Sequence, residues 1–486
     1  MTTVRAKSPA NPTASRAFML SLLNTVVSKF GTIGIGIVMA RLLGPEQFGT
    51  YAIAFVALIA ILSFNELGVS LAIVRWPGDP REIAGTVTTI SMVTSTLLFG
   101  AAFLAAPAFA QAMGDADAAG VVQVMAVCVV INGAVATPAA LMQRDFLQGR
   151  RLAIDQVNVW LGAVVSVILV VAGMGAMSLA IGRVVASLVA AVLFLKYSPM
   201  PVRFGFNKSK LRPLLAFGLP LAASSIVVFA VGYADQIVAG RLLGPVALGF
   251  YVLAFNLASW PSSIFSQPLR TVAPPVFAKL QHDPVAMRSA MLTLVGVVAA
   301  AVFPVVAVMV GVAVPLVTFV YGPAWAGAAV ALSWLAALAA FRIMFELVYD
   351  YLVVLGISGA IFKVQLVWLI ALVPALLAGA TWGGLAGIAA APVAVAAVVI
   401  LPIYLKMLVS QGFRPGQFLA KIWVPVLVAV PVAALSRWLA QEAGHDWQAV
   451  LAAAAVGTVA MGTLLYIRRR DLAEIRGWGR EQGGTA

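Results

Sequence analysis

The sequence predicts an all-α polytopic integral membrane protein, with about 14 transmembrane helices in two pseudo-symmetric six-helix lobes and a C-terminal hairpin. Three observations support this fold class: the apolar composition, a one-sided distribution of basic residues, and a phrase that occurs twice. Of the 486 residues, 62% are hydrophobic and only 10% are charged, and the mean hydropathy is +1.03. Because a water-soluble domain is about 45–50% apolar and about 25% charged, most of this chain must be solvated by lipid.

Apolar stretches long enough to cross a bilayer recur along the whole chain. A spanning helix needs about 20 apolar residues. We expect spans at 18–40, 48–68, 84–108, 119–141, 155–175, 177–197, 213–236, 248–270, 290–313, 328–354, 358–379, 384–406, 420–440 and 447–467. The stretch 18–40 is too long for a signal-peptide core, so we expect it to be retained as the first span.

Basic residues fall mainly on one side of this arrangement. If the N-terminus is cytoplasmic, 24 of the 31 Lys and Arg residues lie on the cytoplasmic side and three on the opposite side, while Lys29, Arg183, Arg342 and Lys363 fall inside spans. Lys and Arg collect on cytoplasmic loops, so the asymmetry predicts an N-in, C-in protein of the bacterial cytoplasmic (inner) membrane. It also accounts for the net charge of +14, so we expect no nucleic-acid partner.

The repeated phrase divides the chain into lobes. Residues 41–55 (RLLGPEQFGTYAIAF) and 241–255 (RLLGPVALGFYVLAF) are identical at nine of fifteen positions. Six spans separate the copies, and an even offset places both on the same side of the membrane. We therefore expect a cytoplasmic tail at 1–17, an N-lobe at 18–197, a cytoplasmic linker at 198–212, a C-lobe at 213–407, a hairpin at 408–467 and a basic cytoplasmic tail at 468–486.

Within the phrase, Gly44-Pro45 and Gly244-Pro245 predict tight turns. We interpret both copies as outer hairpins, with Arg41 and Arg241 at the headgroup level beside Tyr51 and Tyr251. Direct contact with a substrate is the alternative interpretation.

Polar side chains line one face of the first span and one stripe of the eighth. Lys29 lies at the centre of the first face, and Arg270 ends the second stripe. The other members are Ser21, Asn24, Thr25, Ser28 and Thr32 in the first span, and Asn256, Ser259, Ser263, Ser266 and Gln267 in the eighth. Such faces either line a hydrated cavity or hold neighbouring helices together. A lysine favours the cavity, because contacts between helices need no charge.

Ionisable groups inside a membrane are costly and often functional. We expect Lys29, with Arg183 and Arg342, to make the cavity cationic and attractive to a pyrophosphate. Glu346 follows Arg342 by four residues, so the two could form an ion pair, or Glu346 could act in gating or take up a proton.

Two aspartates are further candidates for coupling or gating. Asp235 could bind a coupling cation or a proton, or it could be a headgroup-level charge near Arg241. Asp350 lies near the cytoplasmic end of its span and could simply be hydrated.

Three segments resemble Wzx-like oligosaccharide flippases, the polysaccharide-transporter branch of the MOP exporter superfamily. They are ARLLGPEQFGTYAIAFVALIAILSFNELGVSLAIVRW at 40–76, YADQIVAGRLLGPVALGFYVLAFNL at 233–257 and VYGPAWAGAA at 320–329. The resemblance implies two six-helix lobes around a central cavity and alternating access. It implies translocation of undecaprenyl-pyrophosphate-linked oligosaccharide repeat units to the outer leaflet, for exopolysaccharide, capsule or O-antigen synthesis.

Two other functions stay open on the sequence alone. A multidrug or organic-cation exporter of the same superfamily would need carboxylates and few fixed cations in its cavity. Lys29 in the middle of a span argues against this function. A membrane glycan polymerase or ligase would need catalytic groups outside, where His445 and Asp446 have no nucleophile beside them. We therefore expect a transporter and no enzyme, with no catalytic residue, metal or cofactor. Coupling of transport to H+ or Na+ is left undecided by the sequence. Its expected partners are the lipid-linked glycan, membrane lipids, the polysaccharide polymerase and the chain-length machinery.

Overall fold

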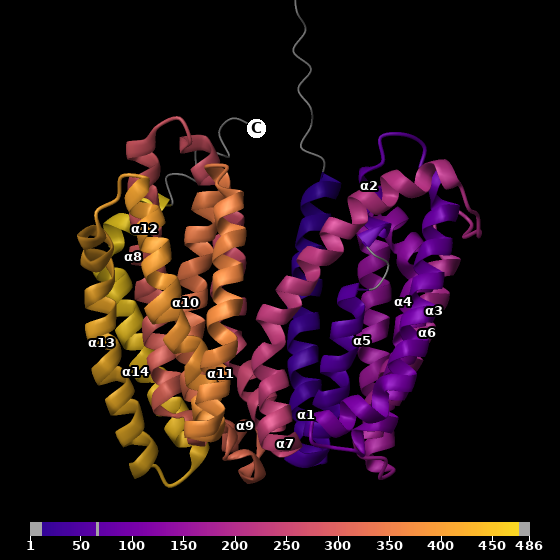
Figure 1. Cartoon of the computed structure of the whole chain (residues 1–486). Helices are drawn as coiled ribbons and strands as arrows, with labels where there is room; N and C mark the ends of the chain where they lie inside the picture. The colour runs from indigo at the N-terminus through magenta and orange to yellow at the C-terminus, as the bar shows by residue number, and fades with distance from the viewer. Residues whose placement is uncertain (1–11, 65–67, 476–486) are drawn as a thin grey trace, which may run out of the picture. The chain divides into compact units, whose positions relative to one another are not determined.

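The computed structural model describes the backbone of residues 12–64 and 68–475, and the side chains of residues 34–64, 68–357 and 359–475. All regular structure in these ranges is helical (Figure 1). Within them, eleven helices are long and apolar enough to cross a membrane. The predicted all-α membrane fold is therefore confirmed, while the count of fourteen spans stays a prediction.

Three of the eleven helices contain a glycine at which the backbone leaves helical geometry. They are α1 (Pro12–Phe64) at Gly44, α7 (Lys208–Leu280) at Gly244 and α11 (Ser358–Val395) at Gly384. Straight, the 73 residues of α7 would extend about 110 Å, far beyond the roughly 30 Å hydrocarbon core. The chain therefore turns within α7, as the Gly-Pro signal predicts.

Both copies of the phrase turn in the same conformation. Gly44 has φ 72° and ψ 174°, and Gly244 has φ 82° and ψ −179°. Positive φ is open to glycine and strained for residues with a Cβ, and the following proline suits the first turn of the next helix. The predicted turns at Gly44-Pro45 and Gly244-Pro245 are confirmed.

Contacts within the chain divide it into two compact units. Unit 1 comprises residues 1–43 and 53–226, and unit 2 comprises residues 44–52 and 227–486. The division falls inside α7 and not in the predicted linker 198–212. The short segment 44–52 packs with unit 2, although it lies within the predicted N-lobe. The lobe boundaries named from the sequence stay a prediction.

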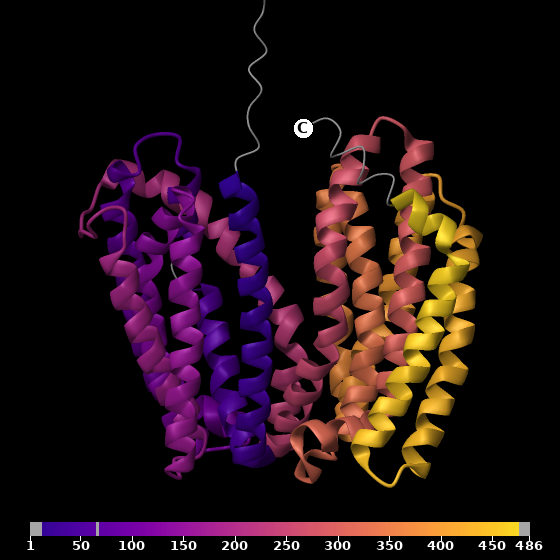
Figure 2. The same cartoon turned by 180° about the vertical axis from the view of Figure 1, so that it is seen from behind.

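Unit 1 contains most of α1 and a group of adjacent helices. These are α2 (Ser70–Arg75), α3 (Arg81–Ala112), α4 (Ala118–Arg144), α5 (Gln148–Val171) and α6 (Ala176–Lys196). Helix α4 packs between α3 and α6, and α5 packs along α6 (Figures 1 and 2). Hydroxyl groups join the pair α3–α4 internally, where Thr88 and Thr137 lie 2.8 Å apart and are both buried.

Unit 2 is built around α8. Its helices are α8 (Pro284–Gly311), α9 (Ala313–Tyr321), α10 (Ala328–Val354), α11, α12 (Leu401–Ser410), α13 (Pro415–Glu442) and α14 (Asp446–Ile467). Helix α8 packs against α10, α13 and α14. It begins at Pro284, because the Asp283 carboxylate accepts hydrogen bonds from the backbone N–H groups of Val285 and Ala286, both at 3.0 Å, as an N-cap residue does.

The two repeated turns contact one another within unit 2. A Cβ added at Gly249 would lie 2.5 Å from the carbonyl oxygen of Pro45, and a Cβ at Gly49 would collide with the carbonyl of Pro245. Only glycine at both positions allows the backbones to approach this closely. The interpretation of the phrase as a structural hairpin is thus supported by its reciprocal packing.

The third segment that carried the family resemblance joins the same cluster. Trp325, 1% exposed, lies between Phe48 and Phe250, with ring centroids 5.5 Å and 6.0 Å away and near-perpendicular planes. This edge-to-face geometry is favoured between aromatic rings. Residues 320–329 therefore fasten the two repeated turns together.

Candidate functional site

The polar face predicted on the first span belongs to the N-terminal part of α1. Asn24, Ser28 and Lys29 are in a helical backbone, but their side chains lie outside the described residues. Their role in a cationic cavity therefore stays a prediction.

Each unit presents one arginine over the same repeated phenylalanine. In unit 1, the guanidinium carbon of Arg183 on α6 lies 5.5 Å from the ring centroid of Phe55. In unit 2, that of Arg342 on α10 lies 5.1 Å from the ring centroid of Phe255. Phe55 and Phe255 are the last residues of the two copies, 200 positions apart.

A cation within about 6 Å of an aromatic centroid is attracted by the ring, so both guanidiniums have a defined position. The ring does not use the guanidinium N–H donors, and neither guanidinium donates a hydrogen bond to a described residue, although Arg342 lies close enough to Asp235 to interact with it electrostatically. The sequence named both arginines but not their aromatic partners, which lie on other helices.

The polar stripe of α7 is largely accessible. Asn256 and Ser263 are exposed and Ser259 is half-buried, with its hydroxyl donating to the carbonyl of Asn256 at 2.6 Å. The intervening Leu257 and Ala258 are buried. Asn256, Ser259 and Ser263 therefore face away from the core of unit 2, whereas Ser266, the next member of the predicted stripe, is buried at 6% exposure.

Glu346 is paired with a different arginine from the one that helix spacing suggested. Its Oε1 lies 3.2 Å from Nη2 of Arg270 on α7, whereas Arg342 lies over Phe255. Of the two alternatives that the sequence left open for Glu346, an ion pair with Arg342 is therefore not the one the described residues form. The i, i+4 rule compares residues on one helix only, and here packing of α7 against α10 brings a competing cation.

Two carboxylate oxygens beside this ion pair have no partner. Glu346 Oε2 and Asp350 Oδ2 are buried and accept no hydrogen bond from any described residue. Over the same part of the chain, no three His, Cys, Asp or Glu side chains gather as a metal site would require. The two acids lie one turn apart on α10, so two like charges are close together at this point of the helix.

Asp235 is buried and hydrogen-bonded. Its side chain is 2% exposed, Oδ2 accepts from the Tyr251 hydroxyl at 2.7 Å, and Oδ1 accepts from the backbone N–H of Gln236 at 2.8 Å. Tyr251 is fully buried, so its ring is packed inside the protein, and its predicted depth beside Arg241 stays a prediction. The interior of unit 2 offers its hydroxyl a carboxylate, which replaces the water it would lose on burial.

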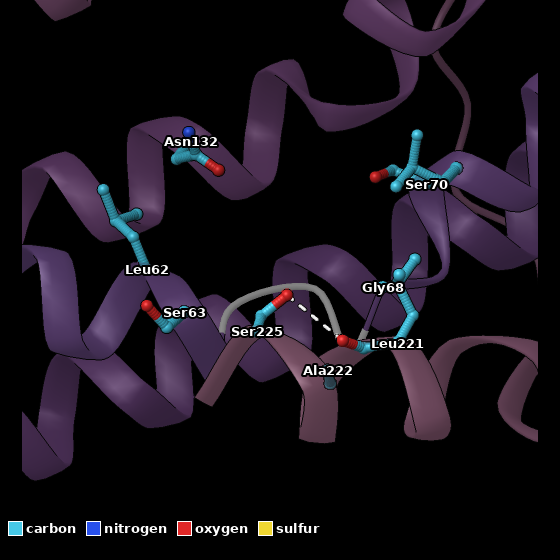
Figure 3. A pocket seen from close by; sticks show the side chains of 9 residues that line it. Leu62, Ser63, Gly68, Ser70, Asn132, Leu221, Ala222 and Ser225 are labelled. Atoms are coloured by element: carbon cyan, nitrogen blue, oxygen red, sulfur yellow. Dashed lines mark hydrogen bonds between the residues drawn. The ribbon is translucent and has the colours of Figure 1, made fainter. Parts of the chain in front are cut away.

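Unit 1 contains a small polar pocket that the sequence did not indicate. Its volume is about 200 Å3, and four polar side chains and apolar neighbours line it: Ser63 on α1, Ser70 on α2, Asn132 on α4 and Ser225 on α7, with Leu62, Gly68, Leu71, Leu221 and Ala222 (Figure 3). The Ser225 hydroxyl donates to the Leu221 carbonyl at 3.1 Å, and that of Ser63 to the Ile59 carbonyl at 2.8 Å. In the sequence, only its place could have indicated Asn132, because it is a polar amide in the middle of the predicted span 119–141.

The family model described as "Polysaccharide biosynthesis protein" matches residues 38–330, more than half of the chain. The succinoglycan biosynthesis transport protein ExoT of Rhizobium meliloti is 26% identical, and the alignment covers 92% of each chain. The lipopolysaccharide biosynthesis protein WzxC of Escherichia coli is 23% identical over 83% of this chain and 84% of its own.

Two solved structures have a similar fold. The lipid II flippase MurJ in an inward closed conformation superposes with a TM-score of 0.77, at 12% identity, over 94% of this chain and 100% of its own. An inward-facing multidrug resistance MATE family transporter of the MOP superfamily gives 0.60, at 16% identity, over 78% and 94%. The apolar helices, the repeated turns and the matched family model lead to one conclusion: the chain belongs to the polysaccharide biosynthesis protein family of membrane proteins, as its resemblance to Wzx-like flippases predicted.

Proposed function

We propose that this protein is a flippase that moves undecaprenyl-pyrophosphate-linked oligosaccharide repeat units from the inner to the outer leaflet, for exopolysaccharide, capsule or O-antigen synthesis. The observation that carries the proposal is the pair of arginines, Arg183 over Phe55 and Arg342 over Phe255. The named functions of ExoT and WzxC, in succinoglycan transport and lipopolysaccharide biosynthesis, support the same class of substrate.

The proposed chemistry follows from the geometry of a guanidinium. Its planar set of N–H donors can hold two oxygens of a phosphate at once, so each arginine is by itself suited to bind a phosphate group. The phenyl ring under each guanidinium limits its rotamers, which reduces the entropy lost when the anion binds. Lys29 would add a third positive charge.

The glycan needs a different surface from the pyrophosphate. Hydroxyl and amide side chains exchange hydrogen bonds with sugar hydroxyls as they would with water. The accessible stripe of Asn256, Ser259 and Ser263 and the pocket beside Asn132 are the groups we assign to this role. A volume of about 200 Å3 is below the 300–1,000 Å3 of ordinary ligand pockets, so the pocket would hold only a part of the glycan.

Alternating access needs an element whose state a driving ion or the substrate can bias. We assign this gating role to Glu346 and Asp350, since a buried oxygen of each accepts no hydrogen bond from the part of the chain that the structure describes, and an ion bound there would compete with Arg270 for Glu346. The Asp235 carboxylate already accepts a hydrogen bond from Tyr251, which belongs to the second repeated segment. We therefore assign Asp235 a structural role in that segment and not a role in ion binding. We place the protein in the bacterial inner membrane, N-in and C-in, where a polymerase and the chain-length machinery would receive its product.

The test replaces the two arginines together in cells that make the polysaccharide. We expect Arg183→Ala with Arg342→Ala to reduce exported polysaccharide by about tenfold or more, since an ionic hydrogen bond to a phosphate contributes about 1.5–3 kcal/mol, and to leave lipid-linked oligosaccharide on the cytoplasmic side. Arg437→Ala, which removes an exposed arginine of α13, is the matched control. Normal export at wild-type protein abundance would rule the proposal out.

Deletion of the gene separates the alternatives. A flippase leaves undecaprenyl-linked oligosaccharide accumulated and facing the cytoplasm, whereas a polymerase or ligase leaves it on the outer face or unmade. An organic-cation exporter, the alternative that the MATE-like fold raises, leaves the glycan unchanged and sensitises the cells to cationic drugs.

A further inference from the structure

The segment between α6 and α7 is fastened to the beginning of α3. The Thr89 hydroxyl donates to the Gly205 carbonyl at 2.8 Å, and the backbone N–H of Gly205 donates to the Gly85 carbonyl at 3.3 Å. The backbone N–H of Asn207 donates to the Thr86 hydroxyl at 3.0 Å. The segment is therefore held in one place along unit 1.

Two facing glycines set the depth of this contact. A Cβ at Gly85 would lie 3.3 Å from both the backbone N and the Cα of Gly205, so larger residues would push the chains apart. Gly85 and Thr89 lie in the first turns of the predicted span 84–108. Residues 203–207 consequently lie beside the beginning of that predicted span, where we expect the boundary between hydrocarbon and headgroups.

Two aromatic side chains at this level are exposed. Phe204 is 71% exposed and Phe206 is 63% exposed, one on either side of Gly205. Because the backbone between them contacts α3, their rings point away from the bundle. Most of the surface of both rings is therefore not covered by the protein and is available to an external apolar phase.

Basic side chains flank the two rings. Arg203, Lys208 and Arg212 are exposed, and the segment 198–212 contains no Asp or Glu. Lys210 differs, because it pairs with Glu82 at 2.8 Å and lies 5.1 Å from the ring centroid of Trp76. The four ion pairs found among the described residues include none of the three flanking cations.

We propose that the linker surface, defined as Arg203, Phe204, Phe206, Lys208 and Arg212, binds the headgroups of anionic phospholipids of the surrounding bilayer. The rings enter the boundary of the acyl chains, and the cations lie among the phosphates. Aromatic rings at this depth anchor membrane proteins, and clusters of Lys and Arg beside a span bind anionic lipids. Charge and depth together favour a lipid over an acidic protein partner, which would leave the rings in water.

The first test measures which lipid the purified full chain retains. In mixed micelles of phosphatidylglycerol and phosphatidylcholine at equal amounts, native mass spectrometry should show preferential binding of phosphatidylglycerol. The triple variant Arg203→Ala, Lys208→Ala, Arg212→Ala should reduce this preference by about tenfold. The matched control Lys279→Ala, Lys406→Ala, Arg470→Ala removes the same charge from three exposed positions of unit 2 and should keep the preference. An equal loss in both variants would overturn the proposal.

The second test measures depth and does not depend on charge. Cys128 is the only cysteine, so Cys128→Ser gives a protein without thiols for site-specific labelling. The Ser187 hydroxyl lies 3.9 Å from the Cys128 sulfur and can form a hydrogen bond with the introduced hydroxyl. In that background, a spin label attached through Phe204→Cys in phosphatidylglycerol vesicles should be relaxed more by oxygen than by a water-soluble nickel complex. The opposite result would place the surface in water and assign it to a protein partner. Neither test involves the translocated glycan, so a failure here leaves the proposed function standing.

Discussion

Arg342 has an acid four residues ahead on its own helix, yet it lies over the ring of Phe255. The acid, Glu346, is paired with Arg270 instead. Spacing along a helix indicates which residues can meet, and a second helix decides which of them do. The same holds for Tyr251, which belongs to the repeated phrase and is nevertheless buried against Asp235.

At this scale we predict that Tyr251→Phe destabilises the protein by about 1–3 kcal/mol, because the change removes the donor from a buried carboxylate. Thermal unfolding of the purified protein in detergent should register a lower midpoint. Tyr233→Phe is the matched control, since it removes a phenol hydroxyl from the same helix for which no hydrogen bond is found among the described residues. A midpoint unchanged by Tyr251→Phe would mean that the Asp235 bond contributes nothing to stability.

At the scale of elements, several predicted spans coincide with helices. The span predicted at 328–354 has the same bounds as α10 (Ala328–Val354), and the span at 447–467 differs from α14 (Asp446–Ile467) by one residue. Glycines flank the first stretch at 327 and 356 and precede the second at 444, and the arginines at 468–470 follow the second, so the change in composition marks the ends of both helices. Helices α2 and α9, with six and nine residues, were not predicted because they are too short for periodicity to distinguish them from loops.

The reciprocal contact of the repeated turns gives a second prediction. Gly49→Ala and Gly249→Ala should each destabilise the protein by about 1–3 kcal/mol, since the added methyl group meets backbone that cannot rotate away. Gly36→Ala on α1 is the control, because a Cβ there meets nothing within 4 Å. Folded yield and the unfolding midpoint measure the effect. Equal midpoints for all three variants would show that the turns do not depend on this contact.

At the scale of the whole molecule, contacts within the chain define two units with boundaries at residues 43/44, 52/53 and 226/227, and the two lobes that the repeat suggested stay a prediction. The first part of α7 and the segment 198–207 contact unit 1, while residues 44–52 contact unit 2. A repeat indicates which positions are equivalent in register. It does not indicate which unit a connecting segment packs against, because that depends on hydrogen bonds such as those between Gly205 and α3.

The orientation in the membrane gives the third prediction. In the Cys128→Ser background, a membrane-impermeant maleimide added to intact cells should label Glu442→Cys and not Lys279→Cys. The distribution of Lys and Arg places residue 442 outside and residue 279 inside. Both side chains are exposed, so reactivity would report their side of the membrane. Labelling of Lys279→Cys in intact cells, with Glu442→Cys protected, would reverse the orientation.

The sequence by itself determined that most of the chain is surrounded by lipid, and it determined the fold class, the turns at Gly44 and Gly244, and the family. These features depend on composition, charge distribution and glycine-proline spacing, which can be read along the chain without knowing which helices pack together. The sequence also identified Arg183, Arg342 and Asp235 as unusual groups inside the membrane. Only the tertiary structure decided their partners, Phe55, Phe255 and Tyr251, and the assignment of residues 44–52 to unit 2. The physical reason is that a helical period states which side chains share a face, whereas the residue they meet is set by packing against another helix.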